Sequence, residues 1–456
     1  MQSAQSPHVA RGIPFLGALL RFRFDPLGTL VQLSREHSGL VQLKRGWFFV
    51  SAPSDVQRVL AGPVHYTKGA FSQSVSRTMV DPLQGALGEG LLYSEGELWK
   101  RQRRLAQPAF HKQRIVALTP VMIAAAQHLV EQWSGAMRRG AAVDVVEEMR
   151  GVALDMIGRT VFSTPIDSAG TELSSALVES AVITNDQFWS LVPKPAWLPT
   201  PQNRRLKRLM KTITSSVYQL IEQRRRNPAD QADVLSAYMA TRNEQTGEGM
   251  SDKLLRDEVM TLMIAGFDAV AHSLCWTMYL LAQHADAQAR LRAELDEVLG
   301  GRTPTAEDLP RLGYTTRVLQ EAMRLYPPAW LLARSPTEDD VIDNCPVPLG
   351  STVLSSPFAT HRRPDLWDNP ERFDPDRFTA ERSEGRPKYA YFPFAGGARQ
   401  CIGNMFALQE MQIVVAMVMQ RFRLKLVPER RVEVQAALVL RPKHGIRITL
   451  SEAGAA

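Results

Sequence analysis

A short segment close to the end of the chain holds the residues best suited to chemistry. Residues 392–403, FPFAGGARQCIG, place Cys401 beside Arg399 and three glycines. A buried structural thiol would need no such glycines, and a zinc ligand would need partner ligands at short spacing, which the sequence does not provide. A nucleophilic cysteine would want a nearby base, and the sequence does not identify one.

A thiolate ligand to haem iron is the explanation that accounts for the neighbours of Cys401. Such a ligand needs a loop whose backbone comes close to a flat cofactor, with N–H groups directed at the sulfur. It also needs positive charge for the haem propionates, which Arg399 could supply. The glycines would then shape the loop around a thiolate on iron.

The same segment resembles the haem-ligand loop of the cytochrome P-450 superfamily, Phe-x-x-Gly-x-Arg-x-Cys-x-Gly. The matching positions are Phe394, Gly397, Arg399, Cys401 and Gly403. The resemblance implies that Cys401 is the axial ligand of the iron in haem b (iron protoporphyrin IX) and that Phe394 shields its sulfur. Gly397 can take a positive φ, and Gly403 lets the following helix begin close under the ring, with its N-terminus placing partial positive charge toward the thiolate.

Two further segments match the superfamily and concern the support of this loop. Glu321 and Arg324 form a Glu-x-x-Arg pair, which alone would be an ordinary helix surface pair. Its position before Cys401 gives it value, as does segment 373–378, which matches Phe-x-Pro-x-Arg-Phe. The resemblance implies a partly buried charge triad of Glu321, Arg324 and Arg377, which fixes the approach of the cysteine loop more than it adds stability.

The resemblance also implies which residues bind the haem propionates. Segment 98–110, LWKRQRRLAQPAF, is similar to the Trp-x-x-x-Arg helix of the superfamily, in which Trp99 and Arg103 would reach a propionate. Arg334 stands where the superfamily has another propionate arginine, and Arg399 would be a third. Any one of these arginines could be a surface residue, but three in matching contexts favour a binding role.

The helix expected on the other side of the haem, residues 257–284, departs from the superfamily pattern. That pattern is small-Gly-x-acid-Thr, and here Ala265 and Gly266 would leave room for iron-bound oxygen and substrate. Asp268 is the acid, but Ala269 stands where the threonine is expected. Part of the route that delivers protons to dioxygen is therefore missing.

Some other group must take the place of the missing hydroxyl. We expect a substrate hydroxyl or an ordered water in that place, with Asp268 and His272, one turn later, as the outer relay. A packed helix histidine is the alternative for His272. Peroxide-driven oxidation or an oxygen-free rearrangement are alternatives for the reaction itself.

The resemblance places the walls of a substrate pocket in several separate segments of the chain. These walls are largely apolar and contain no assignable charged anchor, so a lipophilic substrate such as a terpenoid, steroid, polyketide or fatty acid is favoured. Residues of the same kind would also be expected in an ordinary core. The expected pocket residues are Phe71, Val75, Met79, Leu83, Phe188, Trp189, Met263, Phe267, Trp330, Leu331, Ala437 and Leu438.

Length and composition favour one large, mainly helical domain. The chain has 456 residues, of which 45% are hydrophobic, enough for a large core. Two β-type runs around Arg45 and Gly46 predict a hairpin, and Ser251 is the expected N-cap of the long helix. The fold class is mainly α (α+β by strict count), and the resemblance implies the P-450 fold, with haem between the long distal helix and the cysteine loop.

We expect a single haem domain over residues 1–456 with two unequal parts. The β-rich part is expected mainly at 1–65 and 330–360, together with C-terminal strands. The helical part is expected mainly at 66–329 and 400–425.

Cysteine content and hydropathy bear on the location of the protein. Three cysteines are too few and too scattered for a disulfide framework, which points to a reducing cytoplasm. The apolar stretch near the N-terminus is too short for a membrane span. The longer one that begins near Val259 carries Asp268 and His272, so it reads as a buried helix of a soluble protein.

The net charge is +7 and the isoelectric point is about 9.4. The basic residues occur in short groups, at 100–104, 204–211 and 224–226, each within a helical pattern and without interleaved aromatic residues. This pattern is typical of solvated helix faces and argues against nucleic-acid binding. An acidic protein partner is the next explanation, because a basic patch speeds association with one.

Together the motifs indicate a soluble haem-thiolate monooxygenase of bacterial type. It would insert one atom of O2 into a lipophilic substrate by hydroxylation or epoxidation, as a monomer. No flavin or iron–sulfur segment is recognisable, so we expect electrons from a separate ferredoxin or flavodoxin with its NAD(P)H reductase. The alternatives are a haem-thiolate peroxygenase, an enzyme of oxidative rearrangement or coupling, and a non-enzymatic haem sensor.

Overall fold

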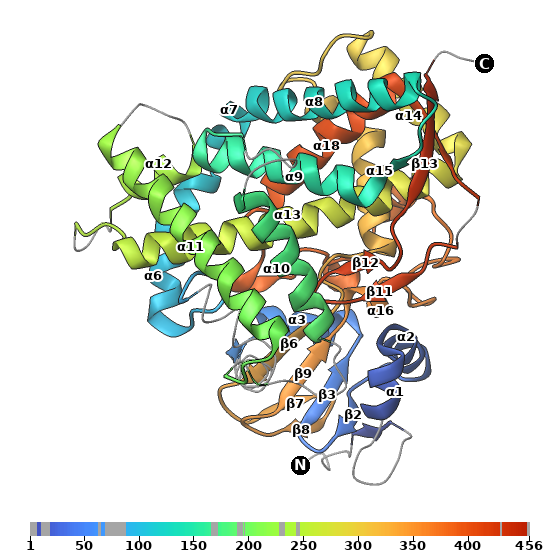
Figure 1. The fold of residues 1–456 in the computed structure, drawn as a ribbon. Helices are drawn as coiled ribbons and strands as arrows, with labels where there is room; N and C mark the ends of the chain where they lie inside the picture. The colour runs from blue at the N-terminus through green and yellow to red at the C-terminus, as the bar shows by residue number, and fades with distance from the viewer. Residues whose placement is uncertain are drawn as a thin grey trace.

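The computed structural model places most of the chain. It describes residues 7–10, 19–62, 65–68, 88–165, 172–188, 195, 197–227, 233–242, 247–428 and 431–453. Within these ranges helices far outnumber strands (Figure 1). The expected mainly α fold with a small β part is confirmed.

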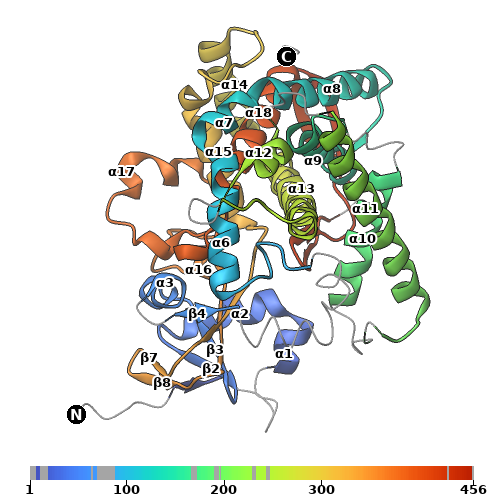
Figure 2. The same ribbon diagram turned by 90° about the vertical axis from the view of Figure 1, so that its left-hand side faces the viewer.

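The larger part of the molecule is built from helices packed around one long helix, α13. Its helices are α6 (Gly96–Ala106), α7 (Lys112–Ala117), α8 (Thr119–Arg138), α9 (Val145–Phe162), α10 (Glu172–Phe188), α11 (Pro201–Arg226), α12 (Val234–Ala240), α13 (Asp252–Gln283), α14 (Ala285–Leu299), α15 (Gly313–Leu325) and α18 (Asn404–Arg421). Figure 2 looks nearly along α13, with α6 on one side of it and α10 and α11 on the other. Helices α9, α11, α15 and α18 pack directly on α13.

The smaller part contains a six-stranded sheet that joins distant segments of the chain. Its order is β1 (His8–Val9), β2 (Val41–Lys44), β3 (Trp47–Val50), β9 (Thr352–Ser355), β6 (Leu332–Pro336) and β4 (Tyr66–Thr67). The predicted hairpin is confirmed, since β2 and β3 are antiparallel around Gly46, whose φ is +73°. β3 pairs in parallel with β9, which brings Phe48 opposite Val353.

Short helices and small sheets complete the frame. Beside the large sheet lie α1 (Leu19–Phe24), α2 (Pro26–Glu36), α3 (Pro53–Ala61) and α16 (Pro357–Thr360). The remaining strands are β7 (Asp340–Ile342), β8 (Cys345–Val347), β10 (Phe422–Leu426), β13 (Arg447–Glu452), β5 (Val143–Asp144), β11 (Val434–Ala436) and β12 (Leu440–Pro442). The remaining short helices are η2 (Gln107–Phe110), η3 (Leu309–Arg311), η4 (Pro375–Phe378), α17 (Ala380–Ser383), η5 (Lys388–Ala390) and η6 (Gly397–Arg399).

Helix α13 is a core helix. The Ser251 side chain accepts a hydrogen bond from the N–H of Leu254, so the predicted N-cap is confirmed. At 1.5 Å per residue its 32 residues extend about 48 Å. Among the described residues it is the one helix long and apolar enough to cross a membrane, but 72% of that apolar stretch is buried inside the protein.

Candidate active site

The cysteine loop lies between η5 and α18 and is shaped by backbone conformations that glycine favours. Gly397 has a φ of +67°, and a Cβ there would collide with the carbonyl oxygen of Leu60 at the end of α3. The loop closes on itself because the N–H of Cys401 donates to the carbonyl of Phe394 at 3.0 Å. Helix α18 begins three residues after the cysteine, with Gly403 as its N-cap.

The Cys401 thiol is solvent-accessible although the loop packs against several elements. Burial among surrounding protein atoms raises the pKa of the thiol, and the backbone N–H of Gly403 and the Arg103 cation act in the opposite direction. Both of these groups favour the thiolate, and a metal ion bound to the sulfur would favour it in the same direction. The surroundings suit a metal-bound thiolate better than a free nucleophile.

Accessible residues of α13 form a second wall. Ala265 is exposed and Ala269 is partly exposed, although most residues in this part of the helix are buried. They are one turn apart on one face, and both have the smallest chiral side chain. Helix α13 packs against α18, which begins three residues after Cys401, in keeping with the expected place of a cofactor between α13 and the cysteine loop.

A group of cations lies beside the cysteine loop, and among the described residues too few anions surround it to balance its charge. Lys68, Arg334 and Arg399 are close enough for their charges to affect one another, and Glu95 is the carboxylate among them. Burial and the charge of Arg334 lower the pKa of Lys68 to about 7. Burial and Arg399 likewise lower the pKa of Arg334 to about 10.

Arg399 illustrates how this cluster is organised. Its Nη2 pairs with Glu95 and donates to the carbonyl of Ser94 at 2.9 Å. Its Nη1 is buried and donates to no partner within the described residues. Its guanidinium lies 4.0 Å from the centre of the Trp99 ring, and Arg103 is close enough to affect its pKa. The structure thus brings together Trp99, Arg103, Arg334 and Arg399, and a planar dianion such as haem with its two propionates fits this donor set.

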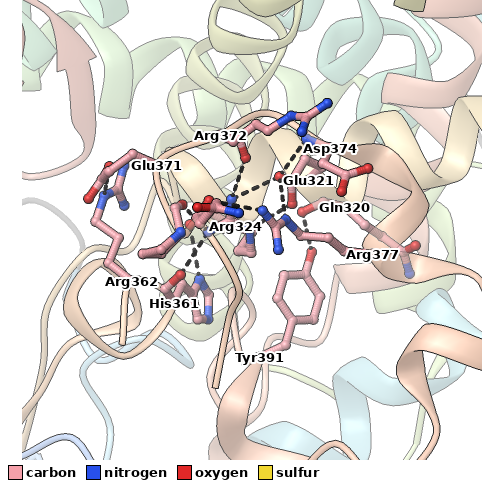
Figure 3. A network of polar contacts seen from close by, with 12 residues as sticks. Gln320, Glu321, Arg324, His361, Arg362, Glu371, Arg372, Asp374, Arg377 and Tyr391 are labelled. Atoms are coloured by element: carbon pink, nitrogen blue, oxygen red, sulfur yellow. Dashed lines mark hydrogen bonds and ion pairs between the residues drawn. The ribbon is translucent and has the colours of Figure 1, made fainter. Parts of the chain in front are cut away.

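Glu321 and Arg324 form a fully buried ion pair on α15 (Figure 3). Arg324 donates through Nε and Nη2 to both carboxylate oxygens, at 2.6 and 2.8 Å. Arg377 of η4 lies 3.4 Å from Glu321, and the N–H of Asp374 also donates to this carboxylate at 2.9 Å. The three predicted residues therefore meet, and Arg324 ties them to the chain by donating to the carbonyl of His361 at 2.8 Å.

His361 connects this ion-pair network to the cysteine loop, and sequence reasoning missed it. Its ring lies 3.3 Å from the carbonyl of Arg324 through Nδ1, and its Nε2 accepts a hydrogen bond from the N–H of Phe392 at 3.0 Å. Burial and the nearby Arg324 hold the pKa of His361 well below its usual value, so the ring is neutral. Nearby, the hydroxyl of Tyr391 donates to the carbonyl of Gln320 at 3.0 Å (Figure 3). No spacing rule in the sequence marks this histidine.

Asp268 and His272 are paired and buried on α13. Asp268 Oδ1 lies 3.3 Å from His272 Nε2 and 3.9 Å from Nε of Arg150 on α9. Burial alone would raise the pKa of Asp268, but His272, Arg150 and Arg441 together hold it below its usual value. His272 is thus a buried histidine in contact with Asp268, and the Asp268 carboxylate also lies near the Arg150 cation.

Several predicted pocket residues are buried in the structure. Met263 and Phe267 are fully buried, because two residues along a helix turn a side chain about 160° away from Ala265. Trp330 and Ala437 are also buried in the core, where Trp330 Nε1 donates to the carbonyl of Ala437 at 2.8 Å. All four are packed against other protein atoms, and their assignment to the pocket stays a prediction.

Gly266 lies close to a neighbouring helix. A Cβ at this position would lie 2.9 Å from Cδ1 of Ile157 on α9, so the glycine allows the two helices to pack closely. Leu331 is partly accessible and Leu438 is 44% exposed, in keeping with a pocket wall. Phe71, Val75, Met79, Leu83 and Trp189, together with the side chain of Phe188, lie outside the described residues.

Comparisons with known proteins agree with this geometry. The family model named Cytochrome P450 matches residues 7–450. The chain belongs to the cytochrome P450 family. Cyclooctat-9-en-7-ol 5-monooxygenase of Streptomyces melanosporofaciens is 34% identical over 423 residues, which cover 91% of this chain and 89% of that protein. Pentalenene oxygenase of Streptomyces avermitilis is 32% identical over 447 residues, which cover 96% of each chain.

Solved structures agree on the fold. The crystal structure of the heme domain of cytochrome P450DA superposes with a TM-score of 0.89 at 27% identity and covers 98% of both chains. The expected P450 fold is therefore confirmed, and the protein is a cytochrome P450 monooxygenase that binds haem. The accessible thiol, the small residues of α13 and the unbalanced cations all fit that cofactor.

Proposed function

We propose that this cytochrome P450 inserts one oxygen atom from O2 into a lipophilic terpenoid-like substrate, by hydroxylation or epoxidation. The joint placement of Cys401 and the unbalanced cations Lys68, Arg334 and Arg399 carries the proposal, because a thiolate and anion-binding groups are what haem b would need. When bound, the haem supplies the iron at which O2 is activated. The overall reaction consumes O2, two electrons and two protons, and it yields the oxygenated product and water.

The residues of the chain would divide the work as follows. Cys401 would be the axial ligand, and Arg334, Arg399, Lys68 and Arg103 would hold the propionates. Of these, Arg399 is already positioned by Trp99 and Glu95. The buried Glu321 network, through His361, would keep the cysteine loop at its distance from the cofactor.

The substrate class is supported by the site and by its relatives. Leu331 and Leu438 provide accessible apolar surface, and Ala265 and Ala269 leave room beside α13. The relatives are named for acting on cyclooctat-9-en-7-ol and pentalenene. The first name is that of an alcohol, which supports a substrate hydroxyl as one replacement for the threonine that Ala269 lacks.

Electrons would come from a separate acidic protein, a ferredoxin or a flavodoxin with its NAD(P)H reductase. Arg104 on α6 and Lys112 and Arg114 on α7 are exposed, and α7 packs against α18, which follows Cys401. A basic face near the thiolate would attract an acidic donor and speed its docking. We propose that the protein works as a monomer in the cytoplasm.

Absorbance titration of the purified ferric protein tests this function. We expect a thiolate-type Soret band that shifts toward the high-spin form with cyclic terpenoid hydrocarbons or alcohols, and incorporation of label from 18O2 with an added redox partner. Absence of a thiolate-type band would overturn the assignment of Cys401. Label from H2 18O2, but none from 18O2, would favour the peroxygenase, for which the replacement of threonine by Ala269 is the supporting observation. An oxidised product without label would favour oxidative rearrangement or coupling.

A further inference from the structure

We propose that the N-terminal half of α13 carries a proton inlet, in which Glu258 takes protons from a surface cavity and passes them through Thr261 toward Ala265. This inference rests on the proposed monooxygenase function, because only a reaction that consumes protons needs such a route. It places the proton source in the part of α13 before Ala265, whereas Asp268 follows Ala265.

A surface cavity of about 760 Å³ opens at the start of α13. Its walls come from α6, α11, α12 and α13, and charged side chains from all but α12 line it, among them Arg101, Arg225 and Asp257. Such a polar, open cavity holds water in solution. Asp257 forms part of its wall, and Glu258 is the next residue, facing inward.

Next to this cavity is a row of buried polar atoms with few hydrogen-bond partners among the described residues. The hydroxyls of Thr261 and Tyr238 and Oε1 of Gln102 have none, and the carboxylate of Glu258 has the N–H of Leu91 as its nearby donor. Buried polar atoms in native proteins are almost always satisfied, by protein or by ordered water. We therefore assign bound water to this region, continuous with the water of the cavity.

The spacing of the residues directs this row toward the active site. Glu258, Thr261 and Ala265 are at positions i, i+3 and i+7 of the helix, which lie on one face. The rise from Glu258 to Ala265 is about 10 Å, a length that one side chain, a hydroxyl and one or two waters can bridge. Glu258 and Thr261 are only 1% and 7% exposed, whereas Ala265 is accessible.

Two glycines allow the turn before α6 to approach this face of α13. A Cβ on Gly90 would collide with the hydroxyl oxygen of Thr261, and a Cβ on Gly88 would collide with the carboxylate of Asp257. Gly88 has a φ of +60°, which favours glycine. The N–H of Glu89 donates to Asp257 at 2.9 Å and holds the turn in place. The backbone of this turn therefore lies directly against the Thr261 hydroxyl.

The charges around Glu258 keep its carboxyl close to the midpoint of titration. The pKa of Glu258 is raised to about 7. Burial and the charge of Asp257 raise it, whereas the N–H of Leu91 favours the charged form. Other groups act through these neighbours. Glu89 raises the pKa of Asp257, and Tyr238 of α12 is affected by both Glu258 and Arg103 of α6. A group with such a pKa both accepts and releases a proton near neutral pH.

Each transfer involves only O–H bonds. The Glu258 carboxyl gives its proton to the Thr261 hydroxyl, which releases its own proton to water beside Ala265. The carboxylate then recovers a proton from water of the surface cavity. No electrons move along the route, and two passages supply the two protons that each turnover consumes.

The test uses the haem-loaded protein with its redox partner and compares Glu258→Gln with the wild type. We expect the fraction of electrons recovered in product to fall roughly tenfold in Glu258→Gln, the lower range for loss of a general acid. Turnover driven by hydrogen peroxide, which brings its own protons, should be unchanged. Glu258→Asp, which keeps a carboxyl, should recover part of the coupling and serves if the glutamine variant does not fold.

Glu410→Gln is the matched control. Glu410 on α18 is also fully buried, with a pKa raised well above its usual value by burial, and its Oε1 has no partner among the described residues. It lies off the route, so coupling should be unchanged. A second readout needs no turnover: infrared difference spectra of the ferric protein between acidic and basic pH should contain a carboxyl band that disappears in Glu258→Gln and persists in Glu410→Gln.

The outcomes separate this inference from the proposed function. Wild-type protein that makes no product with electrons or with peroxide would overturn the monooxygenase function. Active wild-type protein with equal coupling in Glu258→Gln, or without a titrating band that depends on Glu258, would overturn the inlet. Loss of the peroxide reaction together with coupling would also overturn it, because it would assign Glu258 a structural role.

Discussion

Two buried carboxyls on α13 lie on either side of Ala265, and their pKa values are shifted in opposite directions. Asp268 is surrounded by Arg150, His272 and Arg441, and these neighbours keep its pKa low despite burial. Glu258 has no such cation in contact and an acidic neighbour, so burial raises its pKa to about 7. Burial is the same for both, and the difference shows that the neighbouring charges decide which carboxyl keeps a proton.

The comparison also separates two tasks that one relay would otherwise combine. A carboxylate held by arginine orients water and neighbouring side chains but carries no proton to give. A carboxyl near its titration midpoint can deliver protons repeatedly. In this chain, with Ala269 in place of the distal threonine, Asp268 would orient water, and Glu258, on the other side of Ala265, would supply the protons.

The largest effect is expected from removing the cation beside Asp268. Arg150→Met leaves this carboxylate with less compensation, so we expect its pKa to rise and the free energy of unfolding to fall by about 3 kcal/mol. Denaturant unfolding of the haem-loaded protein measures the change. Arg150→Lys, which keeps the charge, should lose less, and Glu258→Gln should cause no loss of stability at neutral pH. A loss of less than about 1 kcal/mol in Arg150→Met would mean that His272 and Arg441 alone compensate the charge of Asp268.

The next prediction concerns pH. Because the pKa of Glu258 is raised to about 7 from its usual 4.5, the native state keeps a proton that the unfolded chain has lost. Its stabilising contribution is complete below pH 4.5 and is lost as the pH rises toward and through 7, by about 2 kcal/mol between pH 5 and 7. Unfolding of the wild type should show this slope and that of Glu258→Gln should lack it. Asp268, whose pKa is lowered, contributes no slope in this window.

A smaller effect is expected from crowding the inlet. Gly90→Ala introduces a Cβ against the Thr261 hydroxyl, so we expect coupling to fall by roughly half and stability to fall by about 1 kcal/mol. The product formed per electron consumed measures coupling, and thermal unfolding measures stability. Gly313→Ala is the control, because a Cβ there would meet its neighbours at ordinary distances, from 3.8 Å. Equal coupling in Gly90→Ala and the control would contradict the position of the inlet.

The smallest effect is expected from restoring the missing hydroxyl. Ala269→Thr adds an alcohol near Asp268, and if Glu258 already supplies protons the gain in coupling should be less than roughly twofold. The comparison requires a hydrocarbon substrate and its alcohol. A large gain with both substrates would show that proton supply is limited at the Asp268 end, and it would also remove the case for assistance by a substrate hydroxyl.

Sequence reasoning succeeded where residue type and local geometry are linked. Gly397 was predicted to need a positive φ, and its φ is +67°. The Ser251 cap and the hairpin at Gly46 are equally local features, and their neighbours in sequence are their neighbours in space. The fold followed from motifs distributed over almost the whole chain.

Other features depend on contacts between distant segments, and sequence alone did not reveal them. Lys68, His361 and Glu258 owe their properties to neighbours from other elements. Met263 and Phe267 were assigned to the pocket by segment, but helical geometry turns them into the core. The angle around a helix can be calculated from sequence, but which of its faces is buried depends on packing against distant segments.

The unbalanced cations Lys68, Arg334 and Arg399 have a consequence for how the protein is made. Their mutual repulsion is a cost to the folded chain alone, and an anionic cofactor removes it, so haem binds the native state and not the unfolded one. By mass action, the folded population then depends on haem concentration. Cells that express this chain faster than they synthesise haem should accumulate protein that degrades, and supplying a haem precursor should raise the yield of intact protein as well as its colour.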